Sequence, residues 1–430
     1  MKTSRRNFLL GGLATAGALA APIAIGSRRA VAASNPKHLV TVFASGGWDT
    51  TYTLDPKPGV ATIDAPNDGA ITTYGGLPIY TSAARPSVAK FFERYGSIAC
   101  VVNGVQMRAI NHPDCSKRIL TGTASEANPD MGSISAYELG RDRPAPYLVL
   151  GPSAVSGPFA SIAARAGSVN QIRSLLTPTA ALPKAAPFSA SKRFAPDDAE
   201  AGLIKSFIQA RANRLKQVNG RMGYNAARYD DFLSSLERRD VLKTFADGFG
   251  DDFTFTLDLR EQIKLGLTAI ERGVAWSLHL EQAFGSWDTH TDNTVQNTMN
   301  EDLYDALTVL GDELAARPGE HGGSMLDDTV VAVVSEMGRT PQLNAANGKD
   351  HWPVTSALLF GAGVAGGRVL GATDDQLQAM NVDLTTGEAR TDGTGTQLLY
   401  TNLAAGILSL VGAPTATYFP SSEAFHAIRA

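Results

Sequence analysis

Cysteine is scarce in this sequence: Cys100 and Cys115 are the two cysteines among 430 residues. Two thiols are too few for a zinc ribbon, so that class of structural zinc site is excluded. The two could form a disulfide in an oxidising compartment, or Cys100 could simply lie buried in a strand. The sequence also lacks an internal repeat of domain size, and no run after the first thirty or so residues is apolar enough to span a membrane.

Charged residues make up 19% of the chain and hydrophobic residues 43%, which is the composition of an ordinary globular protein. The length allows a large core, in one large α/β domain or in two smaller ones.

The N-terminus has the features of an export signal. Residues 4–10 read Ser-Arg-Arg-Asn-Phe-Leu-Leu and resemble the twin-arginine pattern, an uncharged stretch follows over 8–27, and Ala30-Val31-Ala32 supplies a small-residue cleavage site. A membrane anchor is the alternative, although the Gly and Ala of the stretch make it only weakly apolar. We therefore predict a signal peptide over 1–32, a single domain over 33–430, and a periplasmic or extracellular location.

Twin-arginine export carries proteins that are already folded, often with a cofactor inserted, so this signal favours a bound metal. Removal of residues 1–32 leaves 33 basic and 42 acidic residues, a net charge of −9. That charge argues against nucleic acid or an anionic membrane as the main partner. The partners that we expect are the twin-arginine export machinery and an anionic ester substrate.

Hydrophobic patterns predict strands that alternate with helices, and this order favours a three-layer α/β/α fold. Residues 52–85 and 372–393 are predicted to be loops, and 364–371 a Gly-rich turn. Residues 152–196 are irregular, and 152–250 is a candidate cap or insertion. The predicted strands are 38–44, 97–103, 147–150, 274–284, 329–335 and 356–360, and the predicted helices are 87–95, 197–218, 229–249, 259–273, 294–316 and 394–411.

Three polar loops follow predicted strands and organise the rest of the chain. They are GGWDTT at 46–51, SWDTHTDN at 286–293, and the long loop that runs from Ser335-Glu336 to Asp350-His351-Trp352-Pro353. Sites in open α/β sheets lie at the carboxyl ends of strands, so we expect the three loops to meet at one edge of one sheet.

Each residue of these loops also has a plainer interpretation. Asp49 is typical of a turn or cap residue, and the segment of Asp288 and His290 could be a helix cap with Asp292 or Thr291 as the cap residue. His279 lies within a predicted strand, where a structural role is favoured over a ligand role. A further loop, 111–116, places His112 and Asp114 near the start of a short helix, a position that favours anions.

The sequence resembles a known bacterial family, the domain of unknown function 1501 family, over most of the mature chain. The resemblance is most specific in SWDTHTDN at 286–293 and in SEMGRTPQLNAANGKDHWP at 335–353, where Met337 replaces the family's usual aromatic residue. GGWDTT at 46–51 fits the first motif of the family more loosely. Many members of the family carry twin-arginine signals.

This family in turn resembles the alkaline phosphatase and sulfatase superfamily, whose enzymes bind one or two divalent metals at the carboxyl ends of strands. The resemblance implies an alkaline phosphatase-like fold and a metal site. Asp49 matches the metal-binding Asp of the first strand, and His112 falls near the place of the nucleophile. The implied metal ligands are Asp49, Asp288, His290, Glu336, Asp350 and His351.

The sequence departs from that superfamily in ways that bear on the metal. His112 stands where a Ser, Thr or Cys nucleophile is expected, with Cys115 and Ser116 nearby, and Glu336-Met337 stands where an Asp-His pair would supply a nitrogen ligand. These departures favour one metal ion with mixed oxygen and nitrogen ligands over a two-zinc site, with Zn²⁺, Mn²⁺ and Ca²⁺ all open.

The expected chemistry is activation of an ester oxygen or a bound water by the metal. His112 could act as nucleophile, general acid or metal ligand. Arg339 could orient an anionic substrate, or form a structural ion pair with Glu336 or Asp350. We therefore expect a metal-dependent hydrolase of phosphate or sulfate esters. The alternatives are a non-catalytic metal- or polymer-binding envelope protein and a phospho-group transferase on the same fold.

Overall fold

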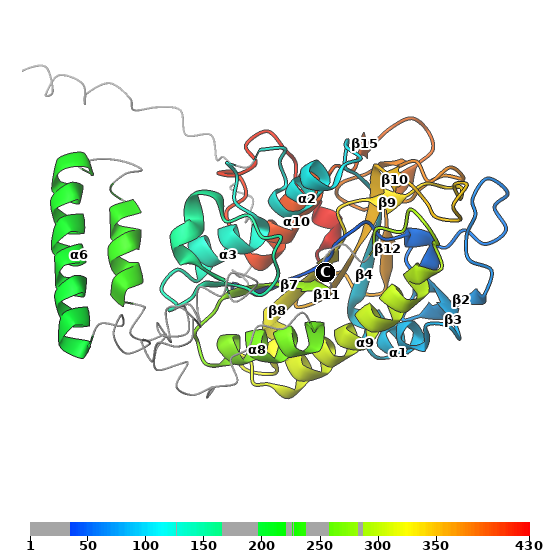
Figure 1. The fold of residues 1–430 in the computed structure, drawn as a ribbon. Coiled ribbons are helices and arrows are strands. Elements are labelled where there is room, and N and C mark those ends of the chain that lie inside the picture. The colour runs from blue at the N-terminus through cyan, green and yellow to red at the C-terminus, as the bar shows by residue number, and fades with distance from the viewer. Residues whose placement is uncertain are drawn as a thin grey trace, which may run out of the picture. The chain divides into compact units, whose positions relative to one another are not determined.

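An eight-stranded sheet organises the chain (Figure 1). Its strand order is β12-β4-β11-β8-β1-β7-β5-β6. Neighbouring strands run parallel, except that β11 runs antiparallel to both β4 and β8. The strands are β1 (His38–Ala44), β4 (Ala99–Gln106), β5 (Tyr147–Val149), β6 (Ala163–Arg165), β7 (Ser277–Gln282), β8 (Thr329–Val334), β11 (Val354–Gly361) and β12 (Arg368–Leu370).

This computed structural model describes residues 35–125, 127–165, 197–220, 226, 228–237, 258–282 and 287–430. The predicted signal peptide lies outside these residues. None of the helices in the described ranges combines the length and the apolar character that a membrane crossing requires.

Side chains on the two faces of the sheet belong to two separate hydrophobic cores. Val40 and Val42 of β1 point to one core, and Leu39 and Phe43 point to the other. Successive side chains of a strand face opposite sides, so a strand that is buried on both faces must be apolar throughout. The all-apolar run Val330–Val334 of β8 meets this requirement.

Within the residues that the structure describes, three helices cover each face of the sheet. Side chains of α1 (Pro86–Tyr95), α8 (Leu259–Glu271) and α9 (Val295–Ala316) share the core of Val40, and those of α2 (His112–Thr121), α3 (Met131–Leu139) and α10 (Tyr400–Val411) share the core of Leu39. Figure 1 shows the two sets of helices on opposite sides of the strands. The predicted three-layer α/β/α class is confirmed.

Most of the predicted elements are present, with ends shifted by a few residues. The predicted helix at 197–218 is α6 (Asp198–Asn219), which begins with a capping box formed by Asp197 and Glu200. The helix predicted at 229–249 is described as far as residue 237, and the remainder lies outside the described residues. The candidate cap over 152–250 is likewise described only in parts.

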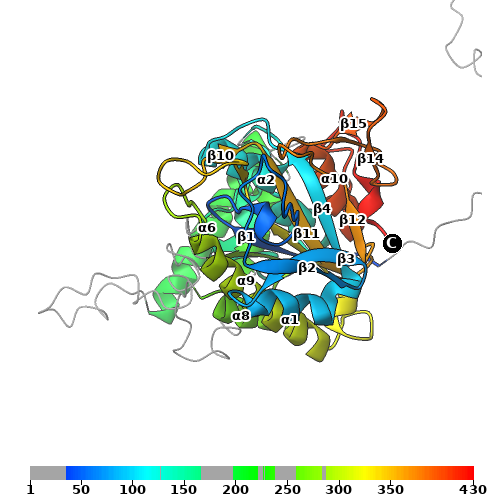
Figure 2. The same cartoon turned by 90° about the vertical axis from the view of Figure 1, so that its right-hand side faces the viewer.

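The loop and turn predictions were wrong in three places. The turn predicted over 364–371 contains β12, which pairs with β4. Residues 52–85 contain a hairpin of β2 (Gly69–Tyr74) and β3 (Leu77–Ser82), which Figure 2 shows beside α1. Residues 372–397 contain a three-stranded sheet of β13 (Asn381–Val382), β14 (Ala389–Arg390) and β15 (Thr396–Gln397). Thr396 and Gln397 pair with β13, so α10 starts at Tyr400 and not at 394.

The strand predicted at 274–284 is β7, but its alternating pattern is not that of a half-exposed strand. All six residues Ser277–Gln282 are buried, including His279 and Glu281, because β7 lies between β1 and β5 in the sheet. The polar side chains of this strand therefore face the protein interior.

Candidate metal centre

Three adjacent parallel strands, β8, β1 and β7, bring the three polar loops to one edge of the sheet. The Gly46 N–H donates to Glu336 Oε1 (2.8 Å), and the Trp48 N–H donates to Ser335 Oγ (3.2 Å). Gly46 has a φ of +127°, and a Cβ on it would lie 2.6 Å from the backbone nitrogen of Asp288. Only glycine permits this contact. The predicted meeting of the three loops is confirmed.

A fourth segment reaches the same edge from β4, which has the same direction as β8. The chain after β4 leads into α2, which begins at His112. The side chain of Asn111 caps this helix by accepting from the N–H of Asp114 (3.0 Å). His112 is thereby held at the start of α2, close to the three loops.

Asp288 lies at the centre of the side chains that gather there. His112 Nε2 lies 3.3 Å from Asp288 Oδ2, and the Nε2 atoms of His290 and His351 lie 3.2 and 3.3 Å from Asp288 Oδ1. The Nε2 atoms of His290 and His351 are 2.9 Å apart. Ligand atoms of His112, Asp288 and His351 all lie within 4.8 Å of one another.

The other nitrogen of each imidazole faces an acceptor. Nδ1 of His112 lies 2.9 Å from Glu336 Oε1, and Nδ1 of His290 lies 2.9 Å from Asp350 Oδ1. Nδ1 of His351 lies 2.7 Å from the carbonyl oxygen of Ile110. Carboxylate and carbonyl oxygens accept hydrogen bonds, so each Nδ1 carries the hydrogen.

This assignment fixes what the Nε2 atoms present to Asp288. A neutral imidazole with its hydrogen on Nδ1 has a lone pair on Nε2. Three such lone pairs then point at a carboxylate, and acceptors that converge at about 3 Å repel one another unless a positive charge lies among them. Arg339 supplies one positive charge at Asp288 Oδ1. Between the Nε2 atoms of His290 and His351, which are 2.9 Å apart, the charge is either an added proton on one ring or a metal ion.

The residues fit a metal ion. Ligating histidines usually donate their second ring N–H to a carboxylate or a backbone carbonyl, and the three Nδ1 contacts have this form. Three nitrogens and one carboxylate are a donor set that suits Zn²⁺ and other transition metals, whereas Ca²⁺ takes six to eight oxygen ligands.

Local interactions change the pKa values of the cluster. Burial raises the pKa of Asp288, but hydrogen bonding and charge from Arg339 outweigh it and hold the pKa below its ordinary value. Burial lowers the pKa of His351. The hydrogen bond to Glu336 raises the pKa of His112, so in the absence of a metal His112 takes up a proton more readily than His351.

Arg339, predicted to bind substrate or to form an ion pair, is fully buried beneath Asp288. Its Nη2 donates to Asp288 Oδ1 (2.8 Å) and to the carbonyl oxygens of Trp287 (3.1 Å) and Gly46, and its Nε donates to the carbonyl of Gly47 (2.7 Å). The ion-pair partner is thus Asp288 and not the predicted Glu336 or Asp350. In this geometry Arg339 orients Asp288 and ties two loops together.

Glu336 and Asp350, two of the predicted metal ligands, lie behind the imidazoles. Glu336 is 1% exposed, and its Oε1 accepts from Gly46 and from His112. Asp350 is exposed and accepts from His290 and from the side chain of Asn344 (3.2 Å). Both carboxylates therefore contact Nδ1 atoms of the rings, whereas Asp288 faces the Nε2 atoms.

Asp49, another predicted ligand, belongs to a separate buried cluster. Its Oδ1 accepts from Thr51 N and Oγ1 (3.1 and 2.7 Å), and its Oδ2 accepts from Asn293 Nδ2 (2.8 Å). Lys349 Nζ lies 2.8 Å from the same Oδ2 and is fully buried. Its contact with Asp49 is an ion pair without hydrogen-bond geometry. Asp49 is thus surrounded by donors, and its carboxylate does not fit a metal ion.

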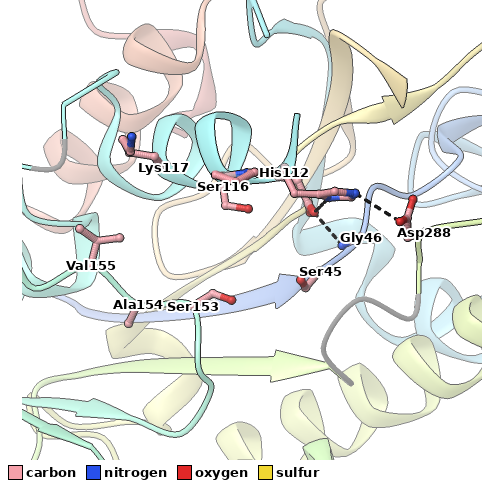
Figure 3. Close-up of a pocket in the computed structure, with 11 residues that line it drawn as sticks. Ser45, Gly46, His112, Ser116, Lys117, Ser153, Ala154, Val155 and Asp288 are labelled. Carbon is pink, nitrogen blue, oxygen red and sulfur yellow. Dashed lines mark hydrogen bonds and ion pairs between the residues drawn. The ribbon is translucent and has the colours of Figure 1, made fainter. Parts of the chain in front are cut away.

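His112, Asp288 and Glu336 form one side of a cavity of about 660 Å³ (Figure 3). Asp288 and the three histidines are partly exposed, with side-chain exposures of 20% to 41%. The cavity continues from there along α2 to the loop 153–155. Its lining residues are Ser45, Gly46, His112, Pro113, Ser116, Lys117, Ser153, Ala154, Val155, Asp288 and Glu336.

Comparison with known proteins gives a family. The family described as "Protein of unknown function (DUF1501)" matches residues 36–236 and 262–388. The chain belongs to the DUF1501 family. The resemblance found in the sequence motifs is therefore confirmed.

Three solved structures resemble this DUF1501 protein distantly. Ps i-CgsB in complex with k-i-k-neocarrahexaose matches 91% of this chain and 75% of its own, with a TM-score of 0.41 and 8% identity. The lipoteichoic acid synthase LtaP from Listeria monocytogenes matches 89% and 74%, with a TM-score of 0.38 and 9% identity. PsFucS1 sulfatase from Pseudoalteromonas sp. matches 93% of this chain and 73% of its own, with a TM-score of 0.35 and 12% identity. Scores this low carry no argument about function. No curated protein matches the chain.

The two cysteines of this DUF1501 protein are free thiols in the structure, and both are buried. Burial raises the pKa of each thiol to about 12. Cys115, which follows His112 on α2, is therefore unsuited to act as the missing nucleophile.

Sequence reasoning missed several residues at this edge of the sheet. Lys349 lies in the motif at 335–353, in a Gly-rich loop directly before Asp350 and His351. Its position was the available signal for a buried lysine that pairs with an aspartate. Gly348 was a second signal, because a Cβ there would lie 2.1 Å from the backbone of His290. For the carbonyl of Ile110 and for the loop 153–155, the sequence offered no signal.

Proposed function

We propose that this protein is an exported, metal-dependent hydrolase of phosphate or sulfate esters. One observation carries the proposal: three imidazole Nε2 atoms and a carboxylate converge at the carboxyl edge of the sheet, with each Nδ1 held by an acceptor. Converging acceptors beside a cavity are the arrangement that a cation would neutralise.

In this proposal Asp288, His112, His290 and His351 hold one metal ion, with Zn²⁺ favoured and Mn²⁺ second. A bound metal would polarise an ester oxygen and lower the pKa of a bound water. The surrounding residues keep the ligands in place: Glu336, Asp350 and Ile110 orient the three rings, and Arg339 orients Asp288.

The attacking group in this proposal is water. Cys115 is buried with a raised pKa, and His112 faces Asp288 with the nitrogen that would have to attack. Ser116 lines the cavity one helical turn after His112 and is the hydroxyl of α2 nearest to the expected nucleophile position. Substitution of Ser116 by alanine is expected to leave hydrolysis in place, because water does not depend on that side chain.

The deciding experiment measures metal content and ester hydrolysis on the same protein, purified after native export. We expect a stoichiometric metal and hydrolysis of p-nitrophenyl phosphate or p-nitrophenyl sulfate, both lost in an Asp288→Asn/His351→Ala double variant. His321→Ala is the matched control, because His321 also faces a carboxylate, Asp328, at 3.2 Å but is not part of this cluster. Native protein purified without a bound metal would contradict the proposal.

The second candidate is a non-catalytic metal- or polymer-binding envelope protein. It is favoured by the absence of a standard nucleophile at His112 and by the partial exposure of the cluster. Stoichiometric metal without turnover of any ester would select it. Turnover that requires an added acceptor alcohol would select the phospho-group transferase instead.

A further inference from the structure

The cavity has a second wall, opposite the metal centre, that the proposed function does not use. This wall is the loop Ser153–Val155, which follows β5. Figure 3 shows the hydroxyl groups of Ser153, on this loop, and Ser116, on α2, directed into the cavity on the side of His112. A substrate whose ester group lies at Asp288 would have its remaining part between these two elements.

Two buried carboxylates hold the loop from behind. Glu281 of β7, which is 2% exposed, accepts from the Ser153 N–H (3.0 Å) and from Ser153 Oγ (2.8 Å). Asp130, also 2% exposed, accepts from the Val155 N–H (2.7 Å) and from the Tyr147 hydroxyl (2.9 Å). Buried carboxylates are costly unless they are fully hydrogen-bonded, so these contacts fix the position of the loop.

The contact with Glu281 also fixes the direction of the Ser153 hydroxyl. Ser153 Oγ donates to Glu281 Oε1, so the hydroxyl hydrogen of Ser153 points to Glu281 and away from the cavity. Ser153 Oγ then presents only lone pairs to a ligand. It recognises a hydrogen-bond donor, and a group without a donor would leave its lone pairs unpaired.

The charge near the loop selects the kind of donor. Lys117 lines the same cavity and carries a cation, with its Nζ 3.7 Å from Asp114 Oδ1. A second cation beside it would be repelled, so a hydroxyl is favoured over an ammonium group. Pro113, Ala154 and Val155 supply apolar surface on which a carbon skeleton can pack.

We infer that Ser153 is a specificity-determining residue that binds a hydroxyl of the non-reacting part of the substrate, which makes the substrate class anionic esters of polyols. The inference rests on the proposed function in one respect: it takes the cavity beside Asp288 as the place where the ester binds. It concerns binding, so it can be tested without turnover.

The test compares ligands that differ only in hydroxyl groups. Binding of glycerol 1-phosphate and propyl phosphate to the full chain is measured by calorimetry, together with the matching pair of sulfate esters. We expect the hydroxylated member of one pair to bind roughly fivefold or more tightly, the effect of about one hydrogen bond. Ser153→Ala should remove the preference by weakening only the hydroxylated ligand, and Ser153→Thr should keep it.

Ser156→Ala is the control, because Ser156 belongs to the same segment but does not line the cavity. A wild-type protein that binds both members of each pair equally, or binds neither, overturns the inference. Equal weakening of both members in Ser153→Ala overturns it as well. A preference that persists in a protein without any esterase activity would count against the proposed hydrolase and not against the role of Ser153.

Discussion

The tripeptide Trp-Asp-Thr occurs after two neighbouring parallel strands, and its two copies lie in different chemical environments. Asp49, after β1, is 2% exposed and is neutralised by the ammonium of Lys349. Asp288, after β7, is one-third exposed and faces three imidazoles. Both aspartates need a positive charge nearby, but only Asp288 has imidazole nitrogens around it and lines a cavity.

The comparison shows why the same short motif need not give two metal sites. Asp49 receives its cation from the protein itself, together with donors from Thr51 and Asn293. Asp288 receives one guanidinium contact, from Arg339, and the remaining lone pairs around it are supplied by His112, His290 and His351. The preference for one metal over two, drawn from the sequence, stays a prediction, and the Asp49–Lys349 pair supports it.

The largest effect is expected from removing the internal cation. Lys349→Met leaves the Asp49 carboxylate buried without its counter-charge, which should lower the free energy of unfolding by about 3–5 kcal/mol. Urea unfolding of the full chain at neutral pH measures this change. Adding Asp49→Leu to Lys349→Met should recover a large part of the loss, because the double variant buries no lone charge.

Lys216→Met provides the control for that loss. Lys216 also pairs with an aspartate, Asp230, but both side chains are substantially exposed (35% and 57%), and exposed ion pairs contribute at most about 1 kcal/mol. A loss below about 1 kcal/mol in Lys349→Met would show that the Asp49–Lys349 pair does not neutralise a buried charge as described.

The next largest effect is expected on metal affinity, from the carboxylates that hold two of the imidazoles around Asp288. Glu336→Gln and Asp350→Asn keep the shape of each acceptor but remove its charge, so they should weaken metal binding by about 100-fold and about 10-fold. The larger figure belongs to Glu336 because it is buried, whereas the Asp350 side chain is 59% exposed. Competition with a chromogenic chelator gives both affinities.

Asp383→Asn serves as the comparison for these variants. Asp383 is an exposed carboxylate that pairs with Arg390 (2.9 Å) and does not line the cavity, so its loss should not change metal affinity. Unchanged metal affinity in Glu336→Gln would contradict the arrangement in which Glu336 holds the ligand His112.

The sequence predicted the edge of the sheet better than it predicted the partners at that edge. Strand ends follow from local apolar runs, and parallel strands place their carboxyl ends together, so the loops at Asp49, Asp288 and Glu336 could be expected to meet. The partner of each side chain depends on segments distant in the sequence. Lys349 reaches Asp49 and the carbonyl of Ile110 reaches His351 only after the loops have folded.

The sequence patterns also failed to predict features that depend on neighbouring strands. β7 reads as an alternating strand, yet its position between β1 and β5 buries His279 and Glu281 on the inside. The short strands β13 and β15 have too few residues to show a period of two, and they form because they pair with each other.

The smallest effect is the pH dependence of the buried pair. Burial raises the pKa of Asp49, but the charge of Lys349 and the hydrogen bonds to the carboxylate outweigh it, so the folded-state pKa lies below 3.8. The stabilisation from Asp49 is therefore present above pH 3.8 and is lost as pH falls through the lowered folded-state value. In Lys349→Met we expect the direction of the pKa shift to reverse, because burial, which raises the pKa of Asp49, is then opposed only by the hydrogen bonds from Thr51 and Asn293. Protonation of Asp49 then relieves the unpaired charge.

The free-energy gap between wild type and Lys349→Met should therefore narrow as pH falls from 7 toward 3, by at most about 1.4 kcal/mol per pH unit for a single proton. Urea unfolding at several pH values measures the gap, and the other carboxylates largely cancel because both proteins contain them. A gap that stays constant would mean that the proton taken up by Lys349→Met does not reside on Asp49. In that case another group neutralises this aspartate, and its contrast with Asp288 would no longer rest on an internal cation.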